Sequence, residues 1–479
     1  MMKRKQRENK SNNPNTKEYT IITYLFFLLF IGMAAYYVFF MFFRSENFIN
    51  SPYNALQNLF AEHVVRGDIV SSDGETLATT KVDEDLNEHR EYPHDEMFAH
   101  VIGYATNGKA GLENQMNFSL LRSHTFFVDR MINDFSNQKN DGDTVVSSLN
   151  YQLQKAAYYA LDDADGAVIV MEPKTGRILA MVSKPDYNPN TIEKNWEKIN
   201  EGTSSELVNR VTQGQYAPGS VFKIFTTVEF YRENLNGLKN YEFECNGSFT
   251  AGGKTIHCAS NQSHGKENLE MSFANSCNAS YANISLQLDP DAFQSTLDDM
   301  LFNKDLPIAF ESNKSVVSIS SQDGKNMIMD TAIGQGKTYV SPLHMAMIIS
   351  ALDNDGTVMR PYLVDKITNK SGVTVRNYKP QKYKTIFSED ECELFHDYLD
   401  AVISHGTAKM FIGQSYDVYG KTGTAQVSDS TDQVNSWFVA YAQQKGYEDI
   451  AIAVVVEDSG KVGLTGTRVA KKIFDAYYK

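Results

Sequence analysis

The chain has 479 residues, of which 42% are hydrophobic and 22% are charged. This balance provides enough apolar surface for two or three domains and excludes an intrinsically disordered protein. The formal net charge is −14 at pH 7; residues 1–18 carry six basic side chains against two glutamates, so removing their +4 leaves −18 on the remaining chain. Such a negative charge argues against nucleic acid as a partner.

The first predicted element is a transmembrane helix over residues 19–43. The run from Thr20 to Phe43 contains 24 residues without a charge, and at about 1.5 Å per residue such a helix crosses a bilayer with some tilt. A cleaved signal peptide is the alternative, but the apolar run is longer than a signal peptide requires and no small-residue cleavage motif follows it. Because residues 1–18 are basic, we expect them to be a cytoplasmic tail and the rest of the chain to lie outside the cell.

Residues 44–141 form the next predicted domain. They are rich in turn signals, such as SSDG and TNGKAG, between short apolar segments. The highly polar stretch 81–97 predicts an exposed loop, and the polar stretch 133–143 marks a domain boundary. A second domain is therefore expected over residues 142–479.

This second domain has an α+β pattern. A helical stretch at 150–163 precedes two apolar strands that meet at the turn formed by Lys174, Thr175 and Gly176. Near the C-terminus, YGKTGTAQVS, NSWFVAYAQQ and DIAIAVVVED read as successive antiparallel strands, and RVAKKIFDAYYK reads as a closing helix. The pattern predicts an antiparallel sheet flanked by helices.

A candidate nucleophile lies in the segment YAPGSVFKIFTTVEF, residues 216–230. A Pro-Gly turn opens an apolar helix in which Ser220 and Lys223 are three residues apart and therefore lie on one face. Apolar surroundings favour the neutral form of a lysine, and a neutral lysine can activate a serine. Ser136/Lys139 and Ser263/Lys266 have the same spacing, but they lie in polar or glycine-containing stretches.

Two further triplets follow in order, Ser276-Cys277-Asn278 and Lys421-Thr422-Gly423. Other matches to these patterns flank the apolar helix or form the hairpin turn already noted: Ser11/Asn13, Ser45/Asn47 and Lys174-Thr175-Gly176. The order S-x-x-K, S-x-N, K-T-G resembles that of penicillin-binding proteins and serine β-lactamases.

Several other stretches resemble the monofunctional, class B penicillin-binding proteins, so the likeness covers most of the chain: 66–78, 100–113, 166–183, 332–346 and 435–442. The resemblance implies an N-terminal pedestal domain over 44–141 and a transpeptidase domain over 142–479, with the active site between the sheet and the helices. No stretch between the anchor and the pedestal is long enough for a second enzyme such as a glycosyltransferase.

The resemblance also implies the chemistry. Ser220 would attack the carbonyl of the penultimate D-alanine of a peptidoglycan stem peptide, while Lys223 accepts its proton. Ser276 would relay a proton to the leaving amine and Asn278 would bind the substrate backbone, both from a turn between helices. Helix capping is the alternative explanation for Ser276 and Asn278.

The K-T-G segment completes the expected site. Lys421 should begin a strand at the edge of the site, where its charge would lower the pKa of Lys223. Gly423 would let substrate approach this strand as an added β-strand. Thr422 and Thr424 would bind the terminal carboxylate, and by family resemblance the backbone N–H groups of Ser220 and Thr424 would form the oxyanion hole.

The expected partners are peptidoglycan stem peptides, β-lactams, the membrane bilayer and a membrane-embedded glycan polymerase. We expect no cofactor. A β-lactamase or carboxypeptidase is the alternative within the same fold. A β-lactam sensor and a scaffold are the alternatives from another class, and the 18-residue tail is too small for the signalling domain that a sensor requires.

The cysteines leave one question open. Cys245 and Cys258 flank a loop of plausible reach for a disulfide, and paired or free thiols are equally compatible with it. We expect Cys277 to be a free, buried thiol, and Cys392 is uninformative. No Cys/His cluster with zinc-site spacing stands out, so no metal is expected.

Two further features can each be read in two ways. Core packing is favoured for Trp437 over a place on the acceptor side of the site. The Gly334-Gln335-Gly336 segment fits a loop near the site and a tight turn before a helix equally well.

Overall fold

The computed structural model describes residues 15–43, 61–136, 138–201, 205–234, 238–427 and 433–478. The chain divides into two units, residues 1–57 and residues 58–479, which are described separately. In the first unit, helix α1 covers Asn15–Phe43. Its segment Glu18–Phe40 has a mean hydropathy of 2.1 and no buried residue, and among the described helices only this one is long and apolar enough to cross a membrane. The helix predicted for residues 19–43 is confirmed.

The second unit contains a six-stranded sheet in the order β15-β14-β6-β2-β3-β4. Its strands are β2 (Ile69–Val70), β3 (Thr76–Val82), β4 (Glu88–Glu91), β6 (Thr144–Ser147), β14 (Val364–Thr368) and β15 (Thr374–Asn377). Strand β6 is parallel to β2 and antiparallel to β14. The sheet thus continues across the domain boundary expected at residue 142, because β6 pairs with β2, which precedes the boundary, and β14 and β15 extend the sheet on the other side of β6.

The stretch 81–97 is not the loop that its polarity predicts. Strands β3 and β4 form an antiparallel hairpin there, and the 3₁₀ helix η1 (Asp95–Phe98) follows. The Asp83 carboxylate accepts hydrogen bonds from the backbone N–H groups of Asp85 and Asn87 and so closes the turn. Most residues of this hairpin's distal half are exposed, so no alternation of apolar side chains marks it in the sequence.

A buried ion cluster lies in this N-terminal part. Glu113, on α5 (Gly111–Gln115), is fully buried. Its carboxylate accepts from Arg66 Nε at 2.6 Å and from Arg90 Nε at 2.7 Å. The other short elements of residues 61–141 are β1 (Val64–Val65), α4 (Ala99–Ile102), α6 (Asn117–Leu120), α7 (Phe127–Phe135) and β5 (Asn140–Asp141).

A five-stranded antiparallel sheet forms the centre of the second unit, in the order β17-β18-β19-β7-β8. The strands are β7 (Gly166–Met171), β8 (Ile178–Lys184), β17 (Asp417–Gln426), β18 (Val434–Gln443) and β19 (Ile450–Val456). The predicted hairpin around residues 174–176 and the three predicted C-terminal strands are confirmed. Strand β17, which carries the K-T-G segment, is at the edge of the sheet.

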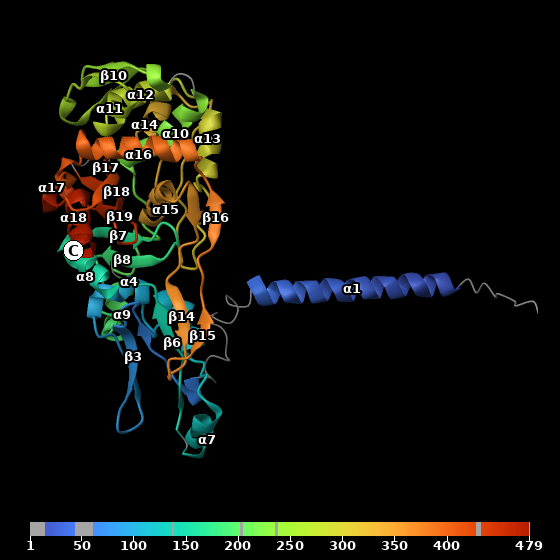
Figure 1. The fold of residues 1–479 in the computed structure, drawn as a ribbon. Helices are drawn as coiled ribbons and strands as arrows, with labels where there is room; N and C mark the ends of the chain where they lie inside the picture. Colours follow the sequence, from blue (N-terminus) through green and yellow to red (C-terminus); the bar gives the residue numbers. More distant parts are fainter. Residues whose placement is uncertain are drawn as a thin grey trace, which may run out of the picture. The chain divides into compact units, whose positions relative to one another are not determined.

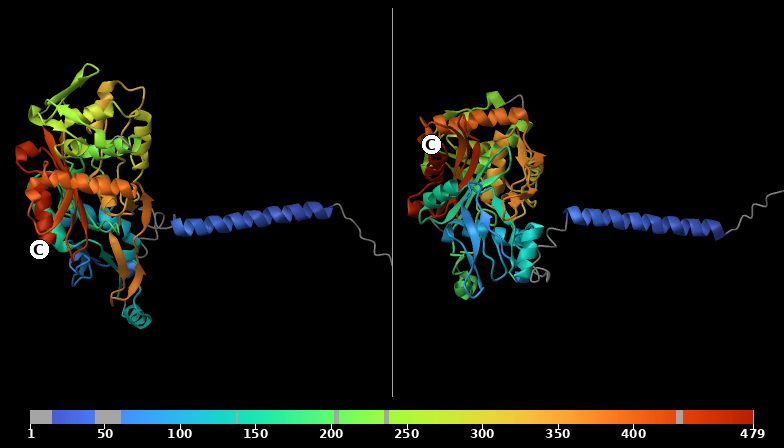
Figure 2. Two further views of the ribbon diagram at one scale, coloured as in Figure 1. Left: turned by 45° about the horizontal axis from the view of Figure 1, so that its top comes forward. Right: turned by 60° about the horizontal axis from the view of Figure 1, so that its bottom comes forward.

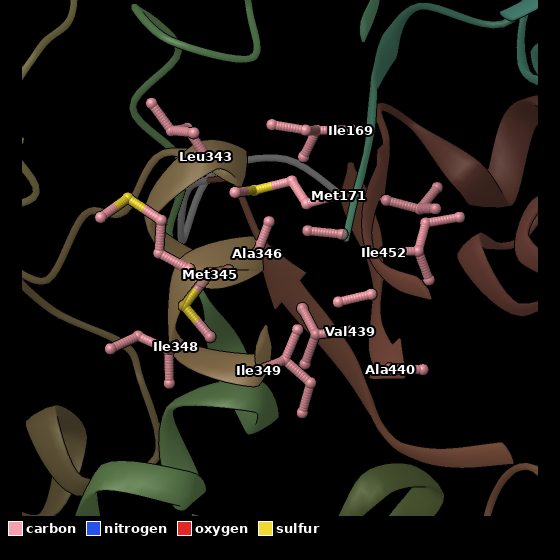
Figure 3. Packing of buried hydrophobic residues seen from close by; sticks show 14 of the residues in the cluster. Ile169, Met171, Leu343, Met345, Ala346, Ile348, Ile349, Val439, Ala440 and Ile452 are labelled. Carbon is pink, nitrogen blue, oxygen red and sulfur yellow. The ribbon is translucent and has the colours of Figure 1, made fainter. Parts of the chain in front are cut away.

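Helices cover both faces of this sheet. α8 (Tyr151–Leu161) and α18 (Gly466–Tyr477) pack against each other and against strands of one face, and α15 (Pro342–Asp353) packs against β7, β18 and β19. Figure 3 shows Ala346 and Ile349 of α15 facing Met171 and Val439 of the sheet, while Met345 and Ile348 point away from it. These residues are buried, and α8 and α18 also carry buried apolar side chains, so the sheet is held between two apolar layers.

The remaining helices lie mostly toward one end of the second unit (Figure 1). They are α9 (Ile192–Glu201), η2 (Gly219–Phe222), α10 (Lys223–Glu233), η3 (Leu238–Asn240), η4 (Ala259–Asn261), α11 (Leu269–Ala274), α12 (Asn278–Ser285), α13 (Pro290–Asp299), α14 (Lys325–Ala332), α16 (Glu389–Ser404), η5 (Lys409–Phe411) and α17 (Ser459–Val462). The small strands are β9 (Phe243–Cys245), β10 (Ser248–Ala251), β11 (Lys254–His257), β12 (Gly265–Glu267), β13 (Thr357–Met359) and β16 (Lys382–Thr385). Strands β9 to β11 contact α12 and form the yellow-green group at the end of this unit (Figure 1, Figure 2).

Candidate active site

The nucleophile segment begins with a tight turn. Ser220 lies in η2, and α10 begins directly afterwards at Lys223. The single predicted helix is therefore a 3₁₀ turn that continues as an α-helix. Gly219 has φ +54°, and a Cβ at this position would lie 2.4 Å from the backbone oxygen of Thr424. Only glycine allows the turn to pack this closely against β17.

The Lys223 amine connects the serine to the second motif. Its Nζ lies 3.2 Å from Ser220 Oγ, 2.6 Å from the backbone oxygen of Ser276, 3.3 Å from Ser276 Oγ and 2.7 Å from Asn278 Oδ1. The structure thus brings together four of the predicted site residues, which come from two segments more than 50 residues apart. The serines of the other two pairs with S-x-x-K spacing do not contact Lys223: Ser263 Oγ, for example, donates to the backbone oxygen of Cys245.

Lys223 is fully buried. Burial lowers its pKa to about 7, while negative charge on Cys277, Cys258 and Glu267 opposes this shift. The Nζ also lies 5.2 Å from the centre of the Tyr281 ring, a contact that stabilises the protonated amine. A substantial fraction of Lys223 is therefore neutral at physiological pH and able to accept a proton.

The S-x-N triplet occupies the turn between α11 and α12, as expected. Ser276 has φ 58°, a left-handed conformation that is uncommon outside glycine. The residue that caps α12 is Cys277, whose sulfur accepts from the backbone N–H of Ser280 at 3.4 Å. Since Cys277 supplies the cap, capping does not explain Ser276 and Asn278, whose side chains contact Lys223 instead.

Lys421 lies in the middle of β17 and not at its beginning. It is fully buried, with Nζ 5.4 Å from the centre of the Phe273 ring and 3.2 Å from the backbone oxygen of Thr422. Burial, and then repulsion from Lys223, hold the pKa of Lys421 well below its usual range. Burial is thus the main cause of the lowered pKa of Lys223, and the charge of Lys223 in turn lowers the pKa of Lys421.

The rest of the K-T-G segment differs from expectation in one respect. A Cβ on Gly423 would lie 3.0 Å from Trp437 Cβ, 3.0 Å from Val221 Cγ1 and 3.1 Å from the backbone oxygen of Pro218. Glycine at this position therefore allows β17 to pack on the nucleophile turn. The expected explanation was the approach of substrate, whereas the observed contacts are with residues of the protein itself.

The two threonines of this strand are accessible. Thr424 is exposed and Thr422 is half-buried. The Thr422 hydroxyl pairs with that of Thr407 at 2.5 Å. Thr407 follows α16 in a short SHGTA stretch that carries no recognisable signal, so this neighbour could not be predicted from the sequence.

The structure decides between the two readings of Trp437 and of the glycine segment. Trp437 is buried and its Nε1 donates to the backbone oxygen of Ala217 at 3.1 Å, which confirms core packing. Gly334 accepts through its backbone oxygen from the N–H of Gly219 at 2.9 Å. The Gly334-Gln335-Gly336 segment is therefore a loop against the nucleophile turn.

The cysteines correct a further expectation. Cys245 and Cys258 are free, with their sulfurs 3.7 Å apart, so the disulfide is absent, and Cys277 is a free buried thiol as predicted. However, Cys245, Cys258, Cys277 and His264 place their ligand atoms within 4.8 Å of one another. A Cys/His cluster thus exists, and the expectation that there is none was wrong. The sequence did not indicate the cluster because its members come from four separate turns and not from a compact motif.

The arrangement of Ser220, Lys223, Ser276 and Asn278 is one that can activate a serine for nucleophilic attack. Comparison with known proteins agrees with this class of site. Residues 166–479 match the family model of the penicillin-binding protein transpeptidase domain, and residues 66–145 match that of the penicillin-binding protein A dimerisation domain. The chain belongs to the penicillin-binding protein transpeptidase family.

Individual relatives share about a quarter of their residues with the chain. Peptidoglycan D,D-transpeptidase PbpA of Mycolicibacterium smegmatis is 27% identical over 455 residues, which cover 85% of this chain and 87% of that protein. Penicillin-binding protein 3 of Bacillus subtilis is 27% identical over 410 residues, which cover 77% of this chain and 59% of that protein.

Solved structures show the same fold. The D,D-transpeptidase domain of a peptidoglycan glycosyltransferase from Eggerthella lenta has a TM-score of 0.75 at 29% identity, over 86% of this chain and 97% of that one. Penicillin-binding protein A from M. tuberculosis, in a ceftriaxone acyl-enzyme complex, has a TM-score of 0.79 at 22% identity, over 88% of this chain and all of that one.

Proposed function

We propose that this protein is a peptidoglycan D,D-transpeptidase that works through an acyl-enzyme on Ser220. The observation that carries the proposal is the position of the Lys223 amine, which lies 3.2 Å from Ser220 Oγ and also contacts Ser276 and Asn278. A serine next to a buried, partly neutral lysine is a nucleophile with its own base. The family membership and the activity named for the PbpA relative support the same reaction.

The first half of the reaction forms an ester. Ser220 Oγ attacks the carbonyl carbon of the penultimate D-alanine while its proton passes to neutral Lys223. The tetrahedral intermediate then collapses, the peptide C–N bond breaks, and the terminal D-alanine leaves as an amine. Ser276 Oγ, 3.3 Å from Lys223 Nζ, is placed to relay that proton from Lys223 to the leaving nitrogen.

The substrate would bind along the edge strand β17. An edge strand leaves backbone N–H and C=O groups without a strand partner on one side, and an extended peptide can pair with them. The hydroxyls of Thr422 and Thr424 would bind the terminal carboxylate. The backbone N–H groups of Ser220 and Thr424 would stabilise the oxyanion, because Gly219 holds the serine turn against the Thr424 backbone.

A substrate carboxylate would also change the charge of Lys421. In the free enzyme burial and Lys223 hold the pKa of Lys421 low. An arriving anion favours the protonated form of a neighbouring amine. Substrate binding would therefore charge Lys421 at the moment when negative charge must be stabilised.

In the second half, an amine from a neighbouring stem peptide attacks the ester, a new amide forms, and Ser220 regains its proton. Water in place of that amine would make the protein a carboxypeptidase or, with a β-lactam, a β-lactamase. The persistence of the acyl-enzyme separates these possibilities. We expect a fluorescent penicillin to remain bound for hours in the transpeptidase, whereas rapid turnover would indicate a lactamase.

We further propose that α1 anchors the enzyme as a single span, with residues 1–18 in the cytoplasm and the catalytic part outside. The basic residues that precede the apolar helix support this orientation. A membrane-embedded glycan polymerase is the proposed partner, because cross-linking requires newly made strands. In this proposal, residues 44–141 form the pedestal and residues 142–479 form the transpeptidase domain.

The test of the catalytic proposal is labelling with a fluorescent penicillin followed by peptide mapping. We expect the label on Ser220, no label in Ser220→Ala, and normal labelling in Ser136→Ala, which removes a serine of the same S-x-x-K spacing. A label on any other residue would refute the proposed nucleophile. Growth rescued by Ser220→Ala in a depletion strain would show that a scaffold role dominates.

A further inference from the structure

A compact group of metal-binding side chains lies beside the S-x-N turn. We call it the thiol cluster; its members are Cys245 at the end of β9, Cys258 after β11, His264 before β12, and Cys277 at the start of α12. The three cysteines are buried, with exposed fractions of 0%, 3% and 0%, and His264 is half-buried. Three thiols and an imidazole in one place form a ligand set that zinc prefers.

The distances between the ligand atoms fit a tetrahedron. With Zn–S of about 2.3 Å and Zn–N of about 2.05 Å, tetrahedral geometry places two sulfurs about 3.8 Å apart and a sulfur and a nitrogen about 3.6 Å apart. The Sγ atoms of Cys245 and Cys258 are 3.7 Å apart, as are those of Cys258 and Cys277, and Cys245 Sγ lies 3.4 Å from His264 Nδ1. All four atoms lie within 4.8 Å of one another.

A disulfide or a simple apolar core fits this geometry less well than a metal site does. A disulfide would require about 2.05 Å between two sulfurs, and it would leave the third thiol and the imidazole without a reason to converge. A simple apolar core would not turn an imidazole nitrogen toward a sulfur. The surroundings also suit thiolate ligands, since the backbone N–H of Ser280 donates to Cys277 Sγ at the beginning of α12.

We propose that Cys245, Cys258, His264 and Cys277 bind one Zn²⁺ ion in a closed, structural site. Four protein ligands fill a tetrahedral shell and leave no position for water or substrate, so the ion takes no part in acyl transfer. Three ligands come from separate turns of the β9–β12 segment and the fourth comes from the start of α12. Because β9 to β12 form only two-stranded sheets, the ion would stabilise this segment by joining its turns to α12.

The zinc site would also hold the catalytic S-x-N turn in place. Cys277 is the middle residue of that triplet, and Asn278 Nδ2 donates to the backbone oxygen of His257, the residue before Cys258, at 2.9 Å. Ser276 and Asn278 both contact the Lys223 amine. A metal bond at Cys277 would therefore restrain two hydrogen-bond partners of Lys223 at once, including the left-handed Ser276. Cys277 is a positioning residue in this scheme, and the effect on acylation rests on the proposed function.

The test uses the full-length protein purified in detergent without chelator. We expect about one zinc per chain by elemental analysis, and replacement by Co²⁺ should give the thiolate charge-transfer and visible bands of a tetrahedral site. His264→Ala and Cys245→Ser should lose the metal. Cys392→Ser, which removes the one cysteine outside the thiol cluster, should retain it. His264 is half-buried, so its removal leaves the core packing intact.

Two further measurements separate this proposal from the catalytic one. Ser220→Ala should bind zinc normally although penicillin cannot label it. Removing zinc from the wild type with a strong chelator should lower its thermal midpoint and slow penicillin acylation by about tenfold or more, with recovery when Zn²⁺ is restored. A wild type that carries no metal and gives no tetrahedral Co²⁺ spectrum, or that contains a Cys245–Cys258 disulfide by mass spectrometry, would overturn the zinc site. An unchanged acylation rate after chelation would overturn the positioning role alone.

Discussion

The protonation state of Lys223 should control the pH dependence of acylation. Only the neutral amine can accept the Ser220 proton, and burial lowers the pKa of Lys223 to about 7. With that pKa, the neutral fraction is about 0.09 at pH 6 and about 0.91 at pH 8, so the second-order rate constant for acylation should rise about tenfold over this interval. Above pH 8 it should rise by less than about 20%, since nearly all of the amine is already neutral.

The assay is the rate of labelling by a fluorescent penicillin at a series of pH values, with circular dichroism at each pH to verify folding. A solvent-exposed lysine would behave differently, because its pKa of about 10.4 would let the rate rise about tenfold per pH unit up to pH 9 and beyond. The matched variant is Lys223→Met, which keeps the length of the side chain and removes the base; acylation should fall by about 10²- to 10⁴-fold. A flat profile between pH 6 and pH 8, or a Lys223→Met variant that acylates normally, would refute the assignment of Lys223 as the base.

Three further predictions follow from the packing and the charges. Lys421→Met should slow acylation by about 10²-fold or more yet leave the midpoint of the pH profile near 7, because burial is the main cause of the lowered pKa of Lys223; a midpoint raised by a full unit would show instead that the charge of Lys421 lowers it. Gly423→Ala should cost about 1 to 3 kcal/mol of unfolding free energy, whereas Gly460→Ala, with no atom nearer than 3.8 Å to the new Cβ, should be nearly neutral; equal urea midpoints would refute the packing role. Glu113→Ala should cost about 3 to 5 kcal/mol by leaving two arginines without their buried partner, and unchanged thermal unfolding would show that the cluster contributes nothing.

The sequence predicted the elements whose signals are local. The apolar run that forms α1, the paired apolar strands β7 and β8, and the Ser220/Lys223 spacing each depend on neighbours within one segment. The three motifs also appeared in the right order to identify the family. The hairpin at 76–91 was missed because its exposed end lacks apolar alternation, and the boundary at 142 did not anticipate that β14 and β15 would join the N-terminal sheet.

Tertiary structure alone decided the electrostatics and the thiol cluster. That both lysines are fully buried, and that the charge of Lys223 lowers the pKa of Lys421, depends on which elements pack around the two amines. The ligands Cys245, Cys258, His264 and Cys277 are separated by 13, 6 and 13 positions, spacings that match no compact zinc motif. They meet because short strands and the start of α12 converge in space, and distances between atoms on separate turns cannot be read from the order of residues along the chain.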